Sequence, residues 1–526
     1  MSEGSNEPSP RRTALDHPRV AILLIGLLLI GSGGWIGLIE PTETRYAEIA
    51  REMLQSGDWL TPRLDGIHHF HKPPLAYWAA AAGMSVVGVN AWGARLLALL
   101  ADLVTIALAA WMARRRFAAL SIDGAKTAWV LGSMLLFAVI GRGIATDPFL
   151  AAAVALYWAL APSSLALAAL GVGFMAKGPV VFLHTALPVL VAALWARDRR
   201  FLSMLGPPRG WIGFAAIALP WYLAVVVLTP GLLGYFLGNQ VVARVATETH
   251  GRGGPLYYFI VVLLAGSAPW TMAMLVGLIR TWRARVDPEA RLLIAWLLAP
   301  VIFLSFSGSK LPSYLLPCFP AAALLAARGL DSALARWGAL LTLAGLALYG
   351  VYELLEAGIT RGPMAPLAIG ACVVWLLGAL AAARGRMILA SLCGVAGVAA
   401  VAIALGPYDS ELGSPRRIAA LLSEQRHGEP VVEIGHFNAG LPFYLRERVR
   451  LVEVPRERGF ENPQSLAVVV GSRDSLRVWA GNSRIWTFGP EIRTRDIAAE
   501  MGLDYVIVAR WKKEALGFVS ISPESR

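Results

Sequence analysis

Charged residues are scarce in this sequence. Asp, Glu, Lys and Arg make up 16% of its 526 residues, against about 25% in soluble domains. Hydrophobic residues make up 56%, so the chain carries too few polar groups to cover a surface in water. This composition excludes a disordered protein, a collagen-like fibre and an ordinary cytosolic enzyme, and it predicts a polytopic membrane protein.

Several functional signatures are also missing. Cys318, Cys372 and Cys393 lie in apolar runs without CxxC or Cys/His spacing, so we interpret them as core residues rather than disulfides or metal ligands. The sequence has no Rossmann glycine fingerprint and no repeated half of the kind found in many transporters. The net charge of +12 is typical of cytoplasmic turns rich in arginine, and we do not expect nucleic-acid binding.

Arginine clusters divide the apolar region, which ends at Leu405, into segments. The positive-inside rule places these clusters in the cytoplasm with the N-terminus, so the chain crosses an even number of times between them. The first run follows Arg11, Arg12 and Arg19 and is long enough to be an uncleaved anchor. About thirteen spans satisfy this rule, and the odd number places the C-terminus outside. They are residues 20–39, 91–113, 125–141, 148–162, 164–176, 179–196, 210–229, 256–279, 290–307, 311–327, 337–352, 365–383 and 387–405.

The composition changes after Gly406-Pro407. Short β-rich runs alternate there with two segments expected to be helical, 416–423 and 497–501, which predicts a small α/β domain. The predicted strands are 431–434, 450–454, 466–470, 484–488 and 505–509. We therefore predict a cytoplasmic tail (1–19), an all-α membrane domain (20–406) with an outer loop (40–90), and a soluble α/β domain (407–526). Within the loop, 75–88 is expected to be an interfacial helix that does not cross.

The first outer loop carries the most suggestive polar residues. Its apolar positions at Tyr46, Ile49, Ala50, Met53 and Leu54 have the spacing of an amphipathic helix on the membrane surface. Pro41 suits the start of that helix, and the Ser-Gly-Asp at 56–58 suits its end. Glu43 would lie in the first turn, where a carboxylate either takes part in chemistry or offsets the helix dipole.

Further outer residues could either take part in ligand binding and chemistry or have a structural or lipid-contacting role. Lys72, in His-Lys-Pro-Pro, could hold a phosphate or contact lipid headgroups. Asp147 could be catalytic or cap a helix. Lys177 and Arg45 could bind a ligand or pair with Asp147 and Glu48. The histidines at 68, 69 and 71 only superficially resemble a metal cluster, because neighbouring positions of an extended segment point in different directions.

These residues together resemble a known family. The segments 41–54, 56–59 and 70–78 are similar to the aminoarabinose lipid A transferases, which belong to the GT-C superfamily together with the protein O-mannosyltransferases. Shorter matches follow in the same order. They are Thr146–Phe149, Ala176–Gly178, His250 with Pro255–Tyr258, Gly266–Trp270 and Ser309–Tyr314. The resemblance covers the chain to about residue 330, and the C-terminal tail shows no such motif.

The resemblance implies a glycosyltransferase of a bacterial inner membrane with a periplasmic active site. Its donor is a polyprenyl-phosphate sugar, such as 4-amino-4-deoxy-L-arabinose, and its acceptor is lipid A or a related envelope glycolipid. A protein acceptor is the same-class alternative; a transporter and a structural or regulatory membrane subunit are alternatives of other classes. We expect contact with membrane lipids and no certain cofactor, although a divalent metal stays open.

The resemblance also suggests roles for single residues. The family usually has Asp-Glu where this chain has Thr42-Glu43, which leaves Glu43, or nearby Glu40, as the first-loop carboxylate; Asp147 is the second catalytic candidate. Lys72, Arg244, Lys310 and the Tyr314 hydroxyl would bind the donor phosphate. Thr42, Arg45, Tyr46 and Lys177 would support the site, and His250 is the candidate metal ligand.

Overall fold

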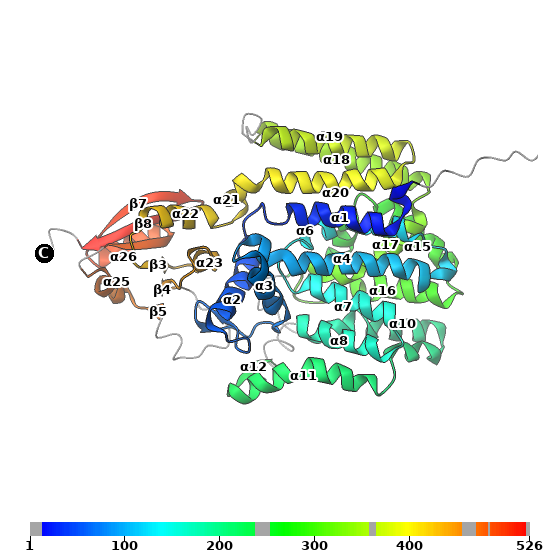
Figure 1. Cartoon of the computed structure of the whole chain (residues 1–526), viewed down its shortest axis with the longest axis horizontal. Helices are drawn as coiled ribbons and strands as arrows, with labels where there is room; N and C mark the ends of the chain where they lie inside the picture. The colour runs from blue at the N-terminus through cyan, green and yellow to red at the C-terminus, as the bar shows by residue number, and fades with distance from the viewer. Residues whose placement is uncertain (1–12, 237–252, 357–363, 455–469, 482–483, 522–526) are drawn as a thin grey trace, which may run out of the picture.

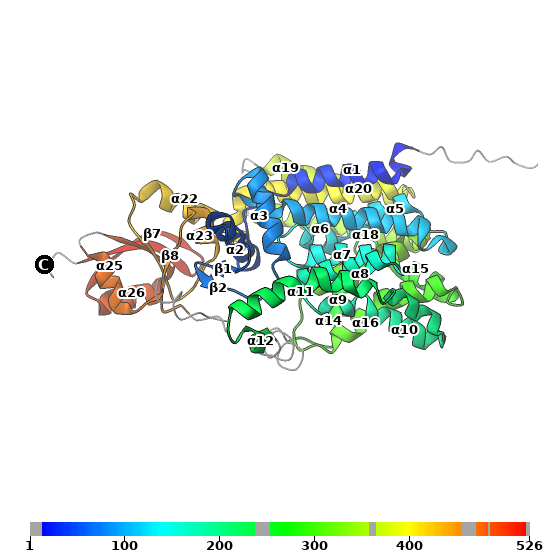
Figure 2. The same ribbon diagram turned by 60° about the horizontal axis from the view of Figure 1, so that its bottom comes forward.

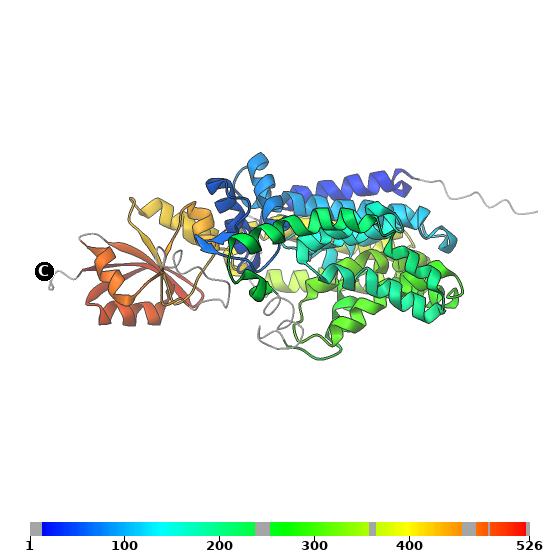
Figure 3. The ribbon, with the colours of Figure 1, turned by 90° about the horizontal axis from the view of Figure 1, so that it is seen from below.

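The computed structural model describes residues 13–236, 253–356, 364–454, 470–481 and 484–521. The molecule is elongated, with a long bundle of helices and a small sheet domain formed by the C-terminal residues (Figure 1). The sheet domain lies beyond one end of the bundle, which we call the sheet-domain end, and α1 (Pro18–Ser32) begins near the opposite end (Figures 1 and 3). This arrangement confirms the predicted fold class, a helical membrane domain followed by a small α/β domain.

The bundle is that of a multi-pass membrane protein. Within the described ranges six helices are long and apolar enough to cross a membrane, or seven if one bent pair counts as a span. The six are α4 (Ala91–Arg115), α11 (Gly210–Leu228), α16 (Pro288–Ser305), α18 (Ala333–Glu356), α19 (Ala365–Ala383) and α20 (Met387–Ala404). Shorter apolar helices are α3 (Leu75–Val87), α7 (Asp147–Leu160), α8 (Ser164–Lys177) and the pair α9 (Val180–Leu183) and α10 (Ala186–Ala196). The count of about thirteen spans stays a prediction.

Two expected spans are not single straight helices. Segment 125–141 breaks at Met134 into α5 (Gly124–Ser133) and α6 (Leu135–Ile140). Segment 256–279 bends by 108° between α14 (Tyr258–Gly266) and α15 (Thr271–Arg283). The two breaks meet: the Leu135 amide donates to the Ala268 carbonyl at 2.9 Å, and Trp270 Nε1 donates to Ser133 Oγ at 2.8 Å. Each interruption is therefore compensated by hydrogen bonds to the other, as an apolar environment requires.

Three other expected spans also differ from the prediction. The first helix, expected over 20–39, is α1 and ends at Ser32, because the following carbonyls of Gly33, Ile36 and Gly37 accept hydrogen bonds from Arg95 instead of continuing the helix. Segment 179–196 is interrupted between α9 and α10. Segment 311–327 begins as a 3₁₀ helix, η5 (Pro312–Cys318), before α17 (Phe319–Gly329), since its prolines remove backbone donors.

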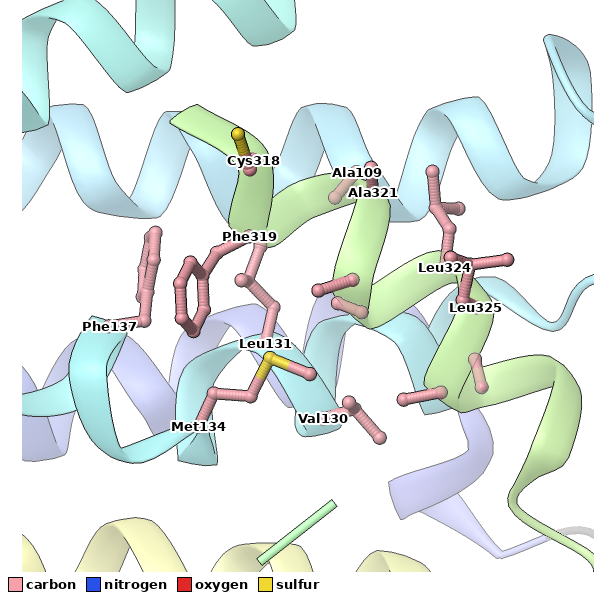
Figure 4. Packing of buried hydrophobic residues seen from close by; sticks show 14 of the residues in the cluster. Ala109, Val130, Leu131, Met134, Phe137, Cys318, Phe319, Ala321, Leu324 and Leu325 are labelled. Carbon is pink, nitrogen blue, oxygen red and sulfur yellow. The ribbon is translucent and has the colours of Figure 1, made fainter. Parts of the chain in front are cut away.

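The core of the bundle is built around α17, which is buried along most of its length. Phe319 at its start faces Phe137 and Met134 from α6 and the α5–α6 break, and Leu324 and Leu325 follow further along the helix (Figure 4). Short helices complete this part of the chain. They are η1 (Ala14–Asp16), η2 (Ala118–Leu120), η3 (Arg199–Leu205), α12 (Leu232–Tyr235), η7 (Gly406–Tyr408) and α21 (Asp409–Leu412).

The first loop contains the predicted amphipathic helix, α2 (Thr42–Ser56), which ends at Gly57 with a φ of 71°. The hairpin β1 (Arg63–Leu64) and β2 (Ile67–His68) and the helix α3 follow it. However, the polar face of α2 is not exposed. Glu48, Arg51 and Glu52 are buried, because the sheet domain packs on that face (Figure 2). The predicted amphipathic helix is therefore present, and its polar face is covered by another domain of the same chain.

The sheet domain has six strands in the order β5-β4-β3-β6-β8-β7. The first four are parallel, and the hairpin β7–β8 adds two antiparallel strands. α22 (Arg416–Gln425) and α23 (Gly440–Leu445) contribute to the apolar core on one face, and α25 (Arg473–Ala480) and α26 (Glu491–Glu500) to the core on the other. The strands are β3 (Val431–Ile434), β4 (Arg450–Val452), β5 (Val470–Gly471), β6 (Ile485–Pro490), β7 (Leu503–Trp511) and β8 (Glu514–Ile521).

Most of the sheet-domain prediction is confirmed. Strand β3 has the predicted bounds and the other four strands overlap their predicted segments, although 466–469 lies outside the described residues. The predicted helices correspond to α22 and α26. β8, α23 and α25 were not predicted.

A close glycine contact between α15 and α17 gives a test of this packing. A Cβ added to Gly277 would lie 1.7 Å from the Leu325 carbonyl oxygen, so Gly277→Ala must push two helix backbones apart. Overpacking of this kind costs about 1–3 kcal/mol or more, and we expect the melting temperature in detergent to fall by several degrees. Gly345→Ala in α18, where no atom lies within 4 Å of the added Cβ, is the control and should not lower it. Equal melting temperatures for both variants would contradict this packing.

Candidate functional site

Glu43, in the first turn of α2, lies in a closed network of hydrogen bonds. Arg95 of α4 donates to both carboxylate oxygens, from Nε at 2.7 Å and from Nη2 at 2.5 Å. The backbone amides of Ile39 and Ile144 donate to the same carboxylate at 3.0 and 3.1 Å. Glu43 therefore joins α2 to the loop 141–146 that leads into α7. Thr42, at the start of α2, is exposed.

Asp147 and Lys177 form the second cluster, together with Tyr314. Lys177 Nζ at the end of α8 donates to Asp147 Oδ1 at 2.5 Å, and both side chains are 7% exposed. The same Nζ lies 4.3 Å from the centre of the Tyr314 ring. The predicted Lys177–Asp147 pair is thus confirmed. The cap alternative for Asp147 is wrong, because Thr146 precedes the first turn of α7 and the Asp147 carboxylate is taken by Lys177.

Lys310 lies just before η5, four residues from Tyr314. Its Nζ donates to the Ser307 carbonyl at 2.7 Å, and the residue is 8% exposed. A Cβ added to Gly254 would lie 3.2 Å from Lys310 Cδ, so the chain returning to α14 passes directly over this lysine. Arg244 and His250 lie in the segment before Gly254, outside the described residues.

The loop that carries Lys72 is anchored by aromatic side chains. Phe70 is fully buried and packs with Met175 of α8 and with Trp221 and Tyr235 from the α11–α12 region. Trp221 Nε1 also donates to the Leu60 carbonyl at 2.9 Å. The half-buried Lys72 follows Phe70 by two positions, and Met175 precedes Lys177 by two. The loop therefore brings Lys72 to the end of α8 that carries the Asp147 pair.

The histidines of this loop do not form a metal centre. His69 and His71 stack with ring centres 4.0 Å apart, and burial, with His71 and Arg45 nearby, holds the pKa of His69 well below its usual range. Among the residues that the structure describes, no group of three or more His, Cys, Asp or Glu side chains could hold a metal ion.

Two supporting residues on α2 lie near this loop. Tyr46 is buried with its ring centre 5.0 Å from that of Tyr77 in α3. Arg45 is half-buried, and its charge acts on both Glu40 and His69. The expected Arg45–Glu48 pair is wrong. Glu48 is held in a bidentate pair with Arg51, one turn away, with N–O distances of 2.7 and 2.6 Å.

Glu40, the alternative first-loop carboxylate, faces the sheet domain. Its Oε1 accepts a hydrogen bond from the Gly440 amide of α23 at 2.7 Å. Burial raises the pKa of Glu40 to about 7, although the Gly440 hydrogen bond and the Arg45 charge favour the ionised form. Glu40 therefore joins the loop to the sheet domain and is not aimed at the cationic cluster.

The site thus gathers Lys72, Lys177, Lys310 and the Tyr314 ring at one end of the bundle, with two carboxylates each bound to a cation. Ammonium groups fixed in this way suit a phosphate-bearing ligand. Both carboxylates also connect to the short loop 141–146. Glu43 accepts a hydrogen bond from the Ile144 amide of this loop, and Asp147 follows the loop directly in the chain.

Known proteins resemble this chain in sequence and in fold. The family model described as dolichyl-phosphate-mannose-protein mannosyltransferase matches residues 35–236. ArnT from Cupriavidus metallidurans, solved bound to undecaprenyl phosphate, superposes with a TM-score of 0.77 over 96% of this chain and 98% of that chain, at 26% identity. The chain thus resembles the aminoarabinose transferases in sequence and in fold.

Curated relatives with similar sequences are named undecaprenyl phosphate-α-4-amino-4-deoxy-L-arabinose arabinosyl transferases. The protein from Pseudomonas fluorescens is 35% identical over 340 residues, which cover 60% of this chain and 59% of the relative. The protein from Edwardsiella ictaluri is 33% identical over 331 residues, covering 59% and 58%. The match thus spans about three-fifths of the length of these relatives.

The sequence analysis missed Arg95, the partner of Glu43 in this GT-C fold. It lies inside an apolar run that was interpreted only as a membrane span. An arginine in such a run is itself a signal, because an ionisable group at membrane depth needs a partner. Asp102, two turns further along α4, is a second buried ionisable residue, 1% exposed and next to Gly141.

The Glu43–Arg95 pair predicts a stability effect. Glu43→Gln leaves the Arg95 guanidinium buried without its counter-charge, which costs about 3–5 kcal/mol. We expect lower membrane accumulation and a melting temperature several degrees lower. Asp58→Asn is the control: its pair with Arg63 is about 30% exposed, and such pairs contribute only about 0–1 kcal/mol. A Glu43→Gln protein as stable as Asp58→Asn would show that the pair is not structural.

Proposed function

We propose that this chain transfers a sugar from a polyprenyl-phosphate carrier to an acceptor on the periplasmic face of a bacterial inner membrane. The observation that carries the proposal is the structural similarity to an ArnT crystallised with undecaprenyl phosphate, which extends over 96% of this chain. The names of the curated relatives suggest 4-amino-4-deoxy-L-arabinose as the sugar. Arginine clusters such as Arg114–Arg116 occupy the end of the bundle opposite the site, which supports a cytoplasmic position for that end.

Lysines on two separate segments supply the groups that donor cleavage needs. As the bond between the anomeric carbon and the phosphate oxygen breaks, the leaving phosphate keeps the electron pair and gains charge. Preorganised cations at that point stabilise the transition state. We assign this role to Lys72 and Lys310, with the Tyr314 hydroxyl and Arg244 as further donors. Lys177, already paired with Asp147, holds Tyr314 in place.

The surroundings of the two carboxylates indicate which chemical class of acceptor the site uses. Glu43 accepts from Arg95 and two backbone amides, and Asp147 accepts from Lys177. Both carboxylates are thus already engaged by cations within the protein, and the family aspartate is replaced by Thr42. An acceptor hydroxyl needs a base, whereas a phosphate is already ionised near neutral pH. We therefore favour a phosphate of lipid A or a related envelope glycolipid, attacking the anomeric carbon directly with inversion.

A protein hydroxyl is the second candidate acceptor. It is favoured by the match of residues 35–236 to the protein mannosyltransferase model. The two acceptors leave different products: one adds a sugar mass to lipid A, and the other adds it to protein.

The donor role of Lys72 is tested in a deletion strain. We expect mass spectrometry to show lipid A without the sugar mass, restored by the wild-type gene. Lys72→Ala should restore at most a few per cent, because loss of one charge-assisted hydrogen bond costs about 1.5–3 kcal/mol. Lys513→Ala, an exposed lysine of the β7–β8 turn, should restore the modification fully. Full restoration by Lys72→Ala at equal protein levels would remove Lys72 from the site, and unchanged lipid A and glycoproteins in the deletion strain would contradict the proposed function.

The nature of the acceptor is tested at Thr42. Thr42→Asp restores the family carboxylate at an exposed helix start, where an acidic residue also suits the helix dipole, so the protein should fold. With a phosphate acceptor, turnover of Thr42→Asp should stay within about threefold of wild type, because no base is needed. Thr42→Asn is the uncharged control. A gain of about 10²-fold with a hydroxyl acceptor, seen for Asp and not for Asn, would instead indicate the protein-acceptor reaction.

A further inference from the structure

A cavity of about 530 Å³ opens at the end of the bundle opposite the transferase site. It lies between η2, the start of α5 and the ends of α15 and α17. Six charged residues line it: Lys126, Arg280, Arg283, Arg328, Asp123 and Asp331. The lining therefore carries an excess of two positive charges.

The acidic residues do not neutralise the whole lining. Asp331 is occupied by Arg280, whose Nη1 lies 2.5 Å from its Oδ1. Asp123 caps α5, accepting from the Lys126 amide at 2.9 Å. Lys126 and Arg283 have no ion-pair partner in the part of the chain that the structure describes. Lys126 and Arg283 thus line the cavity outside any ion pair that the structure describes, and the lining as a whole keeps its excess of two positive charges.

The backbone holds the remaining cations close together. Arg280 Nη1 also donates to the Arg328 carbonyl at 2.7 Å, and Arg328 Nη1 donates to the Leu120 carbonyl. This proximity depends on the tight glycine contact of α15 with α17, where an added Cβ on Gly329 would lie 2.1 Å from the Ala273 carbonyl oxygen. The cavity is therefore fixed by the helix packing and is not a loose surface depression.

An apolar groove adjoins the charged cavity. It has a volume of about 290 Å³ and is lined by Leu278, Ile279, Trp282 and Leu298, and it shares Arg283 with the cavity. Ile279 and Trp282 are 54% and 48% exposed, as expected for side chains that face lipid. The cationic cavity and the apolar groove meet at Arg283, so together they complement a ligand with an anionic head and an apolar tail.

We propose that the cavity and groove together bind one anionic phospholipid. Its phosphate lies between Lys126 and Arg283, and one acyl chain follows α15 along Leu278, Ile279 and Trp282. Basic pockets between membrane helices suit anionic headgroups. A zwitterionic headgroup is disfavoured, because its own ammonium would meet the excess positive charge. This site is independent of the proposed transferase reaction, which takes place at the other end of the bundle.

The test measures lipid binding to the purified full-length protein by native mass spectrometry. Dioleoyl-phosphatidylglycerol, dioleoyl-phosphatidylcholine and inorganic phosphate are titrated against three proteins: wild type, Lys126→Gln/Arg283→Gln, and the control Arg384→Gln/Arg386→Gln. The control removes two exposed arginines outside the cavity, at the α19–α20 turn. All three should fold, which equal melting temperatures verify, since none of the four side chains has an ion-pair partner in the described ranges.

We expect the cavity variant to bind phosphatidylglycerol about 10- to 30-fold more weakly than wild type. Each basic residue near an anionic headgroup contributes about 1 kcal/mol, two are removed, and about 1.4 kcal/mol corresponds to a tenfold change in affinity. The control should stay within twofold, and phosphatidylcholine should bind all three proteins weakly and alike. Undiminished phosphatidylglycerol binding by the cavity variant, or an equal loss in the control, would overturn the site. Inorganic phosphate binding as tightly as phosphatidylglycerol would assign the cavity to a free anion and overturn the lipid.

Discussion

The structure at the sheet-domain end depends on one guanidinium group placed inside an apolar helix. Arg95 of α4 binds Glu43 and three carbonyl groups that follow α1. It thereby ends the first helix, sets the start of α2 and, through the Ile144 amide bound to Glu43, fixes the loop before Asp147. A buried charge is tolerated only when it is paired and its hydrogen bonds are satisfied. The same requirement positions three separate segments around the candidate site.

The sheet domain supplies the polar partners that the first loop lacks on its own. Gly37 and Leu38 donate to Asp409 and Tyr444 at 2.9 and 2.7 Å, and Asp65 accepts from the Val449 amide at 3.0 Å. Glu52 binds the Gly66 amide and lies 3.6 Å from Arg448. The domain therefore covers the polar face of α2, which explains why Glu48, Arg51 and Glu52 are buried.

The sequence predicted those features that depend on residues close together in the chain. The bounds of α2, α19 and β3 and the Asp147–Lys177 pair follow from periodicity, turn residues and motif spacing. The break at Met134 could not be predicted in this way, because the hydrogen bond that permits it comes from Ala268, over a hundred residues away. The partner of Glu43 was missed for the same reason: Arg95 is remote in sequence and lies in a run whose hydropathy masked it. Likewise, no periodicity reveals that a distant domain covers the charged face of α2.

The contacts between the first loop and the sheet domain join residues 372 to 406 positions apart. During synthesis, therefore, the transferase motif emerges long before the residues that satisfy its buried polar groups. Glu40 and Asp65 must remain hydrated until Gly440 and Val449 have been made, and α2 reaches its final surroundings only when the last fifth of the chain has folded. Assembly of the first loop is thus coupled to folding of the sheet domain, and a chain that stops before this domain leaves the charged face of α2 uncovered.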